Sequence, residues 1–214
     1  LMGLSALYNF DNLTEPFNVE VMMRVKQSSA DLDEVIRDMT AILQVQIGNN
    51  ASFVSLHVNE TLTTILHQMR QPITDAQVEI KNELARDLII EGTLPYLQSV
   101  FYNVISNSIK YCKGSESPQI RISASRTGQE IIITISDNGV GFDVEGNRDK
   151  LFRPFTRFST AIDGKGLGLY LIKIQMESMR GRVDIKSKLN AGTSVVLTFP
   201  IPQTIAKREI KHVE

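Results

Sequence analysis

Two asparagines and a lysine lie on one side of a helix that we predict over residues 94–112. Asn103, Asn107 and Lys110 are spaced by four and three residues, which places their side chains on a common face of an α-helix. Asparagine is a mediocre helix former, so helix propensity does not explain two of them beside a lysine. A row of polar ligands that faces a cleft and a plain solvated face are both compatible with this pattern.

An acidic residue and two glycines follow the next apolar segment. The sequence EIIITIS predicts a strand, and Asp137, Gly139 and Gly141 come at its end. A carboxylate in this position can accept a hydrogen bond from an exocyclic amine, and glycines allow a ligand to approach the backbone closely. An Asn-Gly pair by itself is also typical of an ordinary turn.

A glycine-rich segment opens a second predicted helix, over residues 167–180. The segment consists of Gly164, Lys165, Gly166, Leu167 and Gly168. Glycines at a helix N-terminus expose backbone N–H groups and the positive end of the helix dipole, which together bind phosphate. The segment differs from the P-loop, which ends in Lys-Ser/Thr, and its spacing differs from that of the dinucleotide-binding fingerprint.

A long irregular stretch is predicted over residues 143–165, just before this helix. A loop of such length in a compact domain is usually functional or disordered. It contains LFRPFTRF, in which Phe152 and Phe155 could pin a lid while Arg153 and Arg157 face phosphate. The alternative interpretation is a surface loop with a small hydrophobic cluster.

The order and spacing of these segments are more specific than any one of them. NVISN, DNGVGF, LFRPF and GKGLGL, in this order, closely resemble the N, G1, F and G2 boxes of histidine kinases. The resemblance covers roughly residues 50–200. It implies the Bergerat (GHKL) ATP-binding fold, an α+β, two-layer α/β sandwich in which a mixed sheet carries helices on one face. A partial α-helical hairpin would precede this sandwich.

The resemblance also implies roles for residues of the first helix. Asn107 resembles the asparagine that holds Mg²⁺, while Asn103 and Lys110 would lie close to the phosphates. These three are the expected catalytic residues, and Tyr111 would lie beside the nucleotide. ATP and Mg²⁺ are therefore the expected cofactors.

Further nucleotide-binding residues are implied by the other boxes. Asp137 resembles the aspartate that reads adenine, backed by Gly139 and Gly141, and Thr193 matches a threonine near the adenine. The phosphate side of the lid would consist of Phe155, Gly164, Lys165, Gly166, Leu167 and Gly168.

The residue four positions before Asn107 favours one activity of this fold. In the gyrase, chaperone and mismatch-repair ATPases of the same fold, a glutamate at that position activates water. Here the position holds Asn103, which cannot act as a general base near neutral pH. The resemblance thus implies a two-component sensor histidine kinase, whose γ-phosphoryl acceptor is a histidine and whose partner is a response-regulator receiver domain. A GHKL-type ATPase, a serine kinase and a non-catalytic nucleotide-binding scaffold are the alternatives.

None of the three histidines fits the family's acceptor motif, which continues with an acidic residue and then Arg and Pro. Valine follows His57 and His212, and glutamine follows His67. The first residues, LMGLSAL, resemble the stretch after that motif, which puts the acceptor about eleven residues, or three helical turns, before Gly3. We therefore expect this chain to bind ATP without phosphorylating itself.

A long amphipathic helix is predicted over residues 17–47. Its apolar residues alternate steps of three and four and form a narrow seam of the kind that helices bury together; they are Val21, Val25, Leu32, Val35, Ile36, Met39, Ile42 and Leu43. With a turn near Pro16, we expect residues 1–47 to be a truncated dimerisation and phosphotransfer hairpin, through which the full-length protein forms a homodimer. Residues 48–204 would be the ATP-binding catalytic domain and 205–214 a polar tail.

Alternating strands and helices are predicted for the rest of the chain. Strand patterns occur in SFVSLHV, AQVEIKN, DLII, PQIRISAS, EIIITIS, RVDIKSK and TSVVLTF. Asn59 or Thr61 is the expected cap of a helix that runs to about Arg70.

The composition excludes several classes of protein. A net charge of -1 over 214 residues gives no electrostatic reason to expect nucleic acid or anionic lipid as a partner. The single cysteine, Cys112, excludes an internal disulfide and fits a reducing compartment. No apolar run approaches the ~20 residues of a membrane helix. We expect a cytoplasmic location for this portion of a parent protein, which can itself be membrane-anchored.

Overall fold

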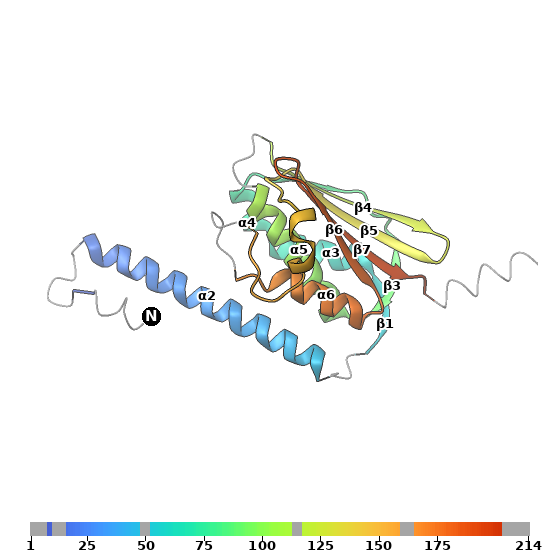
Figure 1. The fold of residues 1–214 in the computed structure, drawn as a ribbon, viewed down its shortest axis with the longest axis horizontal. Coiled ribbons are helices and arrows are strands. Elements are labelled where there is room, and N and C mark those ends of the chain that lie inside the picture. Colours follow the sequence, from blue (N-terminus) through green and yellow to red (C-terminus); the bar gives the residue numbers. More distant parts are fainter. Residues whose placement is uncertain (1–7, 10–15, 48–51, 113–116, 159–164, 203–214) are drawn as a thin grey trace, which may run out of the picture. The chain divides into compact units, whose positions relative to one another are not determined.

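A computed structural model of the chain describes residues 8–9, 16–47, 52–112, 117–158 and 165–202. The chain divides into two compact units, Leu1–Ile47 and Gly48–Glu214 (Figure 1). Each unit is described by itself below.

The first unit contains one long helix, α2 (Pro16–Gln46), close to the predicted bounds. Pro16 occupies the first helical position, where a missing N–H costs no hydrogen bond. Four seam residues spaced as in a heptad repeat are about half exposed: Leu32 (49%), Ile36 (54%), Met39 (48%) and Leu43 (54%). The predicted first arm of the hairpin, residues 1–7, lies outside the described residues. Among the helices of the described ranges, none has the length and apolarity that a membrane crossing requires.

A mixed sheet forms the framework of the second unit. Its strands lie in the order β2-β4-β5-β7-β6, and only β2 runs parallel to its neighbour. Their bounds are β2 (Glu79–Asn82), β4 (Gln119–Thr127), β5 (Glu130–Asp137), β6 (Arg182–Ser187) and β7 (Thr193–Pro200). A separate antiparallel pair consists of β1 (Val54–His57) and β3 (Ile89–Gly92).

Helices cover one face of this sheet (Figure 1). They are α3 (Val58–Gln68), α5 (Leu94–Cys112) and α6 (Gly168–Ser178). Two shorter elements accompany them in the chain, α4 (Arg70–Asp75) after α3 and a 3₁₀ helix, η1 (Glu145–Lys150), before α6. The α+β sandwich with a mixed sheet, predicted from the four motifs, is thus confirmed. The bounds predicted for α5 agree with the structure.

The core lies between the helices and alternate residues of the central strands. Ile131, Ile133 and Ile135 of β5 are buried, and the register sets them opposite the buried Phe199, Leu197 and Val195 of β7. Side chains alternate between the two faces of a strand, so this register assigns one face to the core.

The predicted cap of α3 is wrong. The helix begins at Val58, directly after β1, and His57 holds the cap position. The N–H of Val58, the first of the helix, donates to the Leu88 carbonyl, 3.0 Å away, so a backbone group distant in sequence satisfies it. Asn59 instead donates to the Leu84 carbonyl at 3.2 Å, and the Thr61 hydroxyl bonds the His57 carbonyl at 3.0 Å.

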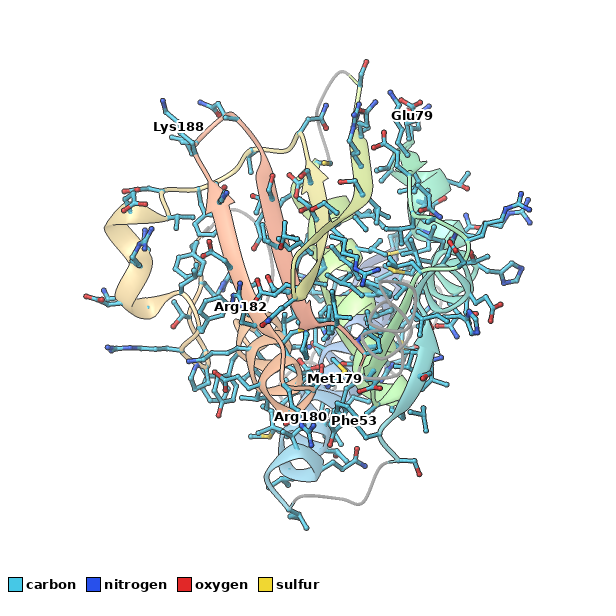
Figure 2. The ribbon with its side chains drawn as sticks, turned by 90° about the vertical axis from the view of Figure 1, so that its right-hand side faces the viewer. Phe53, Glu79, Met179, Arg180, Arg182 and Lys188 are labelled. Atoms are coloured by element: carbon cyan, nitrogen blue, oxygen red, sulfur yellow. The ribbon has the colours of Figure 1, made fainter. Side chains whose placement is uncertain are left out.

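Two further elements differ from the prediction. The stretch 143–165 contains η1, whose start is fixed by a 3.0 Å hydrogen bond from the Gly146 N–H to Asp143 Oδ1. Helix α6 is shorter than predicted because Arg180 has a φ of 59°, outside the helical region. Just after the end of α6, the Arg180 guanidinium lies 5.1 Å from the centre of the Phe53 ring (Figure 2).

Candidate active site

A row of polar residues crosses the sheet where its apolar core ends. The register aligns Ser187 of β6 with Thr193 of β7, and Thr193 with Asp137 of β5. The preceding row on the same face is apolar: Ile185, Val195 and Ile135. Residues directly opposite each other on neighbouring strands project from the same face. The three polar side chains therefore lie on the face that the helices cover.

The Asp137 carboxylate is held in place by several donors. Its Oδ1 accepts the N–H of Gly139 at 3.0 Å and the N–H of Thr193 at 3.1 Å, and the buried Ser108 hydroxyl of α5 also bonds the carboxylate. Burial nevertheless raises the pKa of Asp137, because desolvation outweighs these three hydrogen bonds. A carboxylate has about four acceptor positions, so this one can still accept a donor from a ligand.

The glycines after Asp137 allow close contact with other backbone segments. A Cβ at Gly139 would lie 2.5 Å from the Tyr111 carbonyl oxygen, and Gly141, with a φ of 57°, has the Lys188 carbonyl where a Cβ would be. The N–H of Val140 donates to the Tyr111 carbonyl at 3.1 Å. The segment after Asp137 is thus packed between the end of α5 and the turn that joins β6 to β7.

This turn lies at one end of the sheet. Lys188 marks it in Figure 2, at the other end of β6 from Arg182. The N–H of Asn190 in the turn donates to the Val140 carbonyl at 2.7 Å. A Cβ at Gly192, whose φ is 78°, would overlap the carbonyl oxygen of Asp137. The turn therefore fixes the backbone on both sides of the aspartate.

The two asparagines of α5 lie against the start of α6. A Cβ at Gly168 would be 3.2 Å from Asn103 Oδ1 and 3.5 Å from Asn107 Nδ2. The Asn103 amide nitrogen donates to the Ser99 carbonyl at 2.9 Å, which orients this side chain. The structure thus brings the first and the last of the predicted motifs together, and a side chain at position 168 would lie close to both amide groups.

The segment before α6 packs against the loop that precedes it. Gly166 has a φ of 71°, and a Cβ there would lie 2.5 Å from the Thr156 carbonyl oxygen. Phe152 lies beneath the Lys173 ammonium, 5.9 Å from the ring centre. Phe155, expected to pin the lid, is instead 64% exposed. Phe158 is the packed aromatic residue of this segment: its ring stacks on the Phe142 ring with 4.8 Å between the centres.

Two further predicted residues lie at the end of α5. Lys110 and Tyr111 are half-buried in its last turn. Burial raises the pKa of the Tyr111 phenol, and the positive charge of Arg157 partly offsets this rise, so the loop arginine is near the phenol. In the glycine-rich segment Lys165 is half-buried and Leu167 is buried, whereas Gly164 lies outside the described residues.

Three residues of this region were not recognised as site residues from the sequence. Ser108 lies among the buried, mostly apolar residues of α5, and Ser187 occupies an ordinary strand end, so neither stands out in the sequence. Asn138 was regarded as a turn residue, but its side chain accepts the Gln119 N–H at 2.8 Å and donates to the Ser117 carbonyl at 2.8 Å. Only the three-dimensional pairing of β4 with β5 reveals this role.

Comparison with known proteins agrees with this geometry. The model of the family described as "Histidine kinase-, DNA gyrase B-, and HSP90-like ATPase" matches residues 92–203, more than half of the chain. Sensor histidine kinase AtsR of Burkholderia thailandensis is 28% identical over 195 residues, which are 86% of this chain and 32% of AtsR. Cyanobacterial phytochrome A of a Nostoc species is 32% identical over 152 residues, 70% of this chain and 19% of that protein. The chain thus spans a third or less of these two relatives.

Solved structures share the fold. The histidine kinase AdeS of Acinetobacter baumannii superimposes with a TM-score of 0.71 at 17% identity, covering 89% of this chain and 88% of AdeS. A structure of histidine kinase ThkA in complex with the response regulator protein TrrA gives a TM-score of 0.66 at 15% identity, with 94% and 55% coverage. With its motifs, its mixed sheet and its family match together, the chain belongs to the histidine kinase-, DNA gyrase B- and HSP90-like ATPases, as a catalytic domain of the histidine kinase type.

Proposed function

We propose that residues 48–204 bind Mg-ATP and donate its γ-phosphoryl to a histidine of the parent protein upstream of this chain, from which it passes to a response-regulator aspartate. The observation that carries the proposal is the placement of two polar groups on one helix. Asn103 and Asn107 contact the start of α6, and Ser108, on the same helix, contacts Asp137. A nucleotide whose purine lies at Asp137 would direct its phosphates toward Asn103 and Asn107.

The adenine end of the proposed site is Asp137. Its carboxylate is anchored by backbone N–H groups and offers a further acceptor to an exocyclic amine. Thr193 lies beside it in the same row. The half-buried Tyr111 phenol at the end of α5 gives the nucleotide an aromatic neighbour.

The phosphate end of the proposed site lies between α5 and α6. Gly166, Leu167 and Gly168 lead into the first turn of α6, whose N–H groups suit phosphate oxygens. We assign the positive charge at this end to Lys165, which directly precedes Gly166, and to Lys110, three residues after Asn107 on α5. Phosphoryl transfer is catalysed mainly by positioning and by stabilising the developing charge, and these groups are suited to that task.

Asn107 is the proposed protein ligand of Mg²⁺. Within the described ranges, no cluster of three or more His, Cys, Asp or Glu side chains could hold a metal ion. That fits Mg²⁺ in a nucleotide site, which usually has one or two protein oxygens, several waters and the phosphates themselves as ligands. When bound, the ion would neutralise charge on the phosphate oxygens.

One observation supports transfer rather than hydrolysis. Asn103 lies at the face toward Gly168, where a water-activating carboxylate would be needed, and an amide is no general base. His57 of β1 is followed by valine and His67 of α3 by glutamine, so neither has the expected acceptor motif. The competing function, a GHKL-type ATPase, would release phosphate without any histidine acceptor.

The proposal includes the partners of a two-component kinase. ThkA forms a complex with the response regulator protein TrrA, and a receiver domain is the corresponding partner here. The exposed stripe Leu32, Ile36, Met39 and Leu43 on α2 has the spacing that helical bundles bury, which supports a homodimer through this helix. A cytoplasmic location belongs to the proposal, and a single buried cysteine fits a reducing compartment.

The test measures binding and product formation separately. Mg-ATP binding to the purified chain is followed by calorimetry, and γ-labelled ATP is then supplied to the chain alone and to a protein extended upstream of Leu1. We expect saturable binding, negligible phosphate release, and acid-labile label only on the extended protein. Steady phosphate release by the chain alone would favour the ATPase, and absence of binding would refute the proposal.

A further inference from the structure

The Ser187 hydroxyl makes three hydrogen bonds at the end of the polar row. It receives the N–H of Phe142 at 2.9 Å, donates to the Gly192 carbonyl at 2.9 Å, and lies 2.9 Å from the Thr193 hydroxyl. These partners come from the segment after Asp137, from the turn between β6 and β7, and from the start of β7. One side chain thus joins three segments around the aspartate.

Only one assignment of protons satisfies all three contacts. A serine hydroxyl has a single proton and two acceptor lone pairs. The Phe142 N–H can only donate, and the Gly192 carbonyl can only accept, so the Ser187 proton is used on that carbonyl. The third contact is then a hydrogen bond in which Thr193 donates and Ser187 accepts. The remaining hydrogen-bonding capacity of the Thr193 hydroxyl consists of its lone pairs.

We propose that Ser187 is a positioning residue that sets base specificity, because it commits the Thr193 proton and leaves this hydroxyl an acceptor toward the ligand. The inference rests on the proposed nucleotide site. Asp137 and Thr193 project from the same face of neighbouring strands, and the Thr193 N–H itself bonds the carboxylate. Both side chains would present acceptors to the same edge of a base.

Acceptors on both side chains that face the substituent at position 6 of the purine favour an amine there. Adenine carries an exocyclic amine at this position, which donates, whereas hypoxanthine carries a carbonyl, which accepts. Without the Ser187 hydroxyl, Thr193 could rotate and donate its proton to that carbonyl. The discrimination between ATP and ITP would then fall, because one of the two groups that reject a carbonyl would adapt to it.

A purely structural role of Ser187 has a different consequence. If the hydroxyl only joined the three segments, its removal would loosen the pocket and weaken both nucleotides by the same factor. The ratio of the two affinities separates these accounts. Coupling to Thr193 provides a second criterion, since an effect that acts through one side chain disappears when that side chain is already absent.

The experiment measures Mg-ATP and Mg-ITP affinities of the full chain by calorimetry for Ser187→Ala, Thr193→Val and the double variant. We expect Ser187→Ala to lower the ATP-to-ITP affinity ratio roughly three- to tenfold, the range for one neutral hydrogen bond. Thr193→Val should also lower the ratio, and Ser187→Ala should add little in its presence. Ser187→Thr, which keeps a hydroxyl, should retain the wild-type ratio.

Ser194→Ala is the matched control. Its hydroxyl bonds Ser136 at 2.8 Å on the neighbouring strand, one residue from Thr193 and on the opposite face, so its removal should leave the ratio unchanged. Equal losses for ATP and ITP in Ser187→Ala, or the same loss with and without Thr193, would overturn the inference. If Ser187→Ala fails to fold, an unchanged ATP-to-ITP affinity ratio in Thr193→Val would also overturn the inference. Wild-type protein that binds neither nucleotide would instead refute the proposed function.

Discussion

Replacing Asp137 by asparagine should lower the affinity for ATP without lowering the stability of the fold. Asparagine has the same shape, and its amide oxygen can still accept the N–H groups of Gly139 and Thr193 that now bond Oδ1. The Ser108 hydroxyl can switch from donor to acceptor. The fold should therefore keep its hydrogen bonds at this position.

Affinity for ATP should nevertheless fall sharply. The new amide nitrogen would present a donor to the donating amine of adenine, and a hydrogen bond to a charged group is lost. Such bonds contribute about 1.5–3 kcal/mol, which corresponds to a roughly 10- to 150-fold weaker affinity. Calorimetric titration with Mg-ATP measures this change directly.

Stability without nucleotide should change in the opposite direction. Burial raises the pKa of Asp137, so the folded state disfavours its charged form. The wild type therefore loses stability as the pH rises through the folded pKa, and an uncharged asparagine does not. Asp137→Asn should melt at the same or a higher temperature than the wild type at pH 7. This advantage should vanish once the pH falls below the usual aspartate pKa of 3.8.

The exposed Asp184 of β6 offers a matched control, since Asp184→Asn removes a carboxylate from the same sheet away from the site. It should change neither quantity. An Asp137→Asn protein with wild-type ATP affinity, or with a melting temperature clearly lowered at pH 7, would refute the reasoning.

Three further predictions concern the proposed metal ligand, one glycine and the cysteine. Asn107→Ala should abolish the Mg²⁺-dependent part of ATP binding, measured by calorimetry with and without a chelator. Gly141→Ala should destabilise the protein by more than 2 kcal/mol in urea unfolding, because a Cβ would overlap the Lys188 carbonyl at a φ of 57°. Gly128→Ala, at a φ of 44° with open space around it, should cost only about 1 kcal/mol. Burial raises the pKa of Cys112 to about 11, so iodoacetamide at pH 8 should label it only after unfolding, as mass spectrometry would show.

Local patterns were sufficient to predict most of the fold. The apolar spacing from Leu94 to Cys112 predicted α5 with its correct bounds, and the alternation in EIIITIS predicted β5. The helix and the strand each depend on residues a few positions apart in the chain. Gly168 lies beside the asparagine pair, a contact between distant positions that the combination of motifs suggested.

Features that depend on distant partners were missed. The first N–H of α3 donates to the Leu88 carbonyl, some thirty residues away, and no side-chain hydrogen bond of the cap residue marks the start of the helix. Short α4 contains Pro72, which a periodicity argument treats as a break. The roles of Ser108 and Ser187 depend on which strands pair and in which register. The assigned ligands themselves remain predictions.

The geometry of helix α5 fixes the distances between the polar side chains that it carries. Asn107 and Tyr111 are four residues apart, so the helical rise of about 1.5 Å per residue separates them by roughly 6 Å along the axis. Point substitutions cannot change this spacing, whereas a single inserted residue would turn the distal groups by about 100°. Substitutions can therefore change the polar side chains of α5 one at a time. An insertion or deletion between them would instead turn all the side chains beyond it away from their present direction at once.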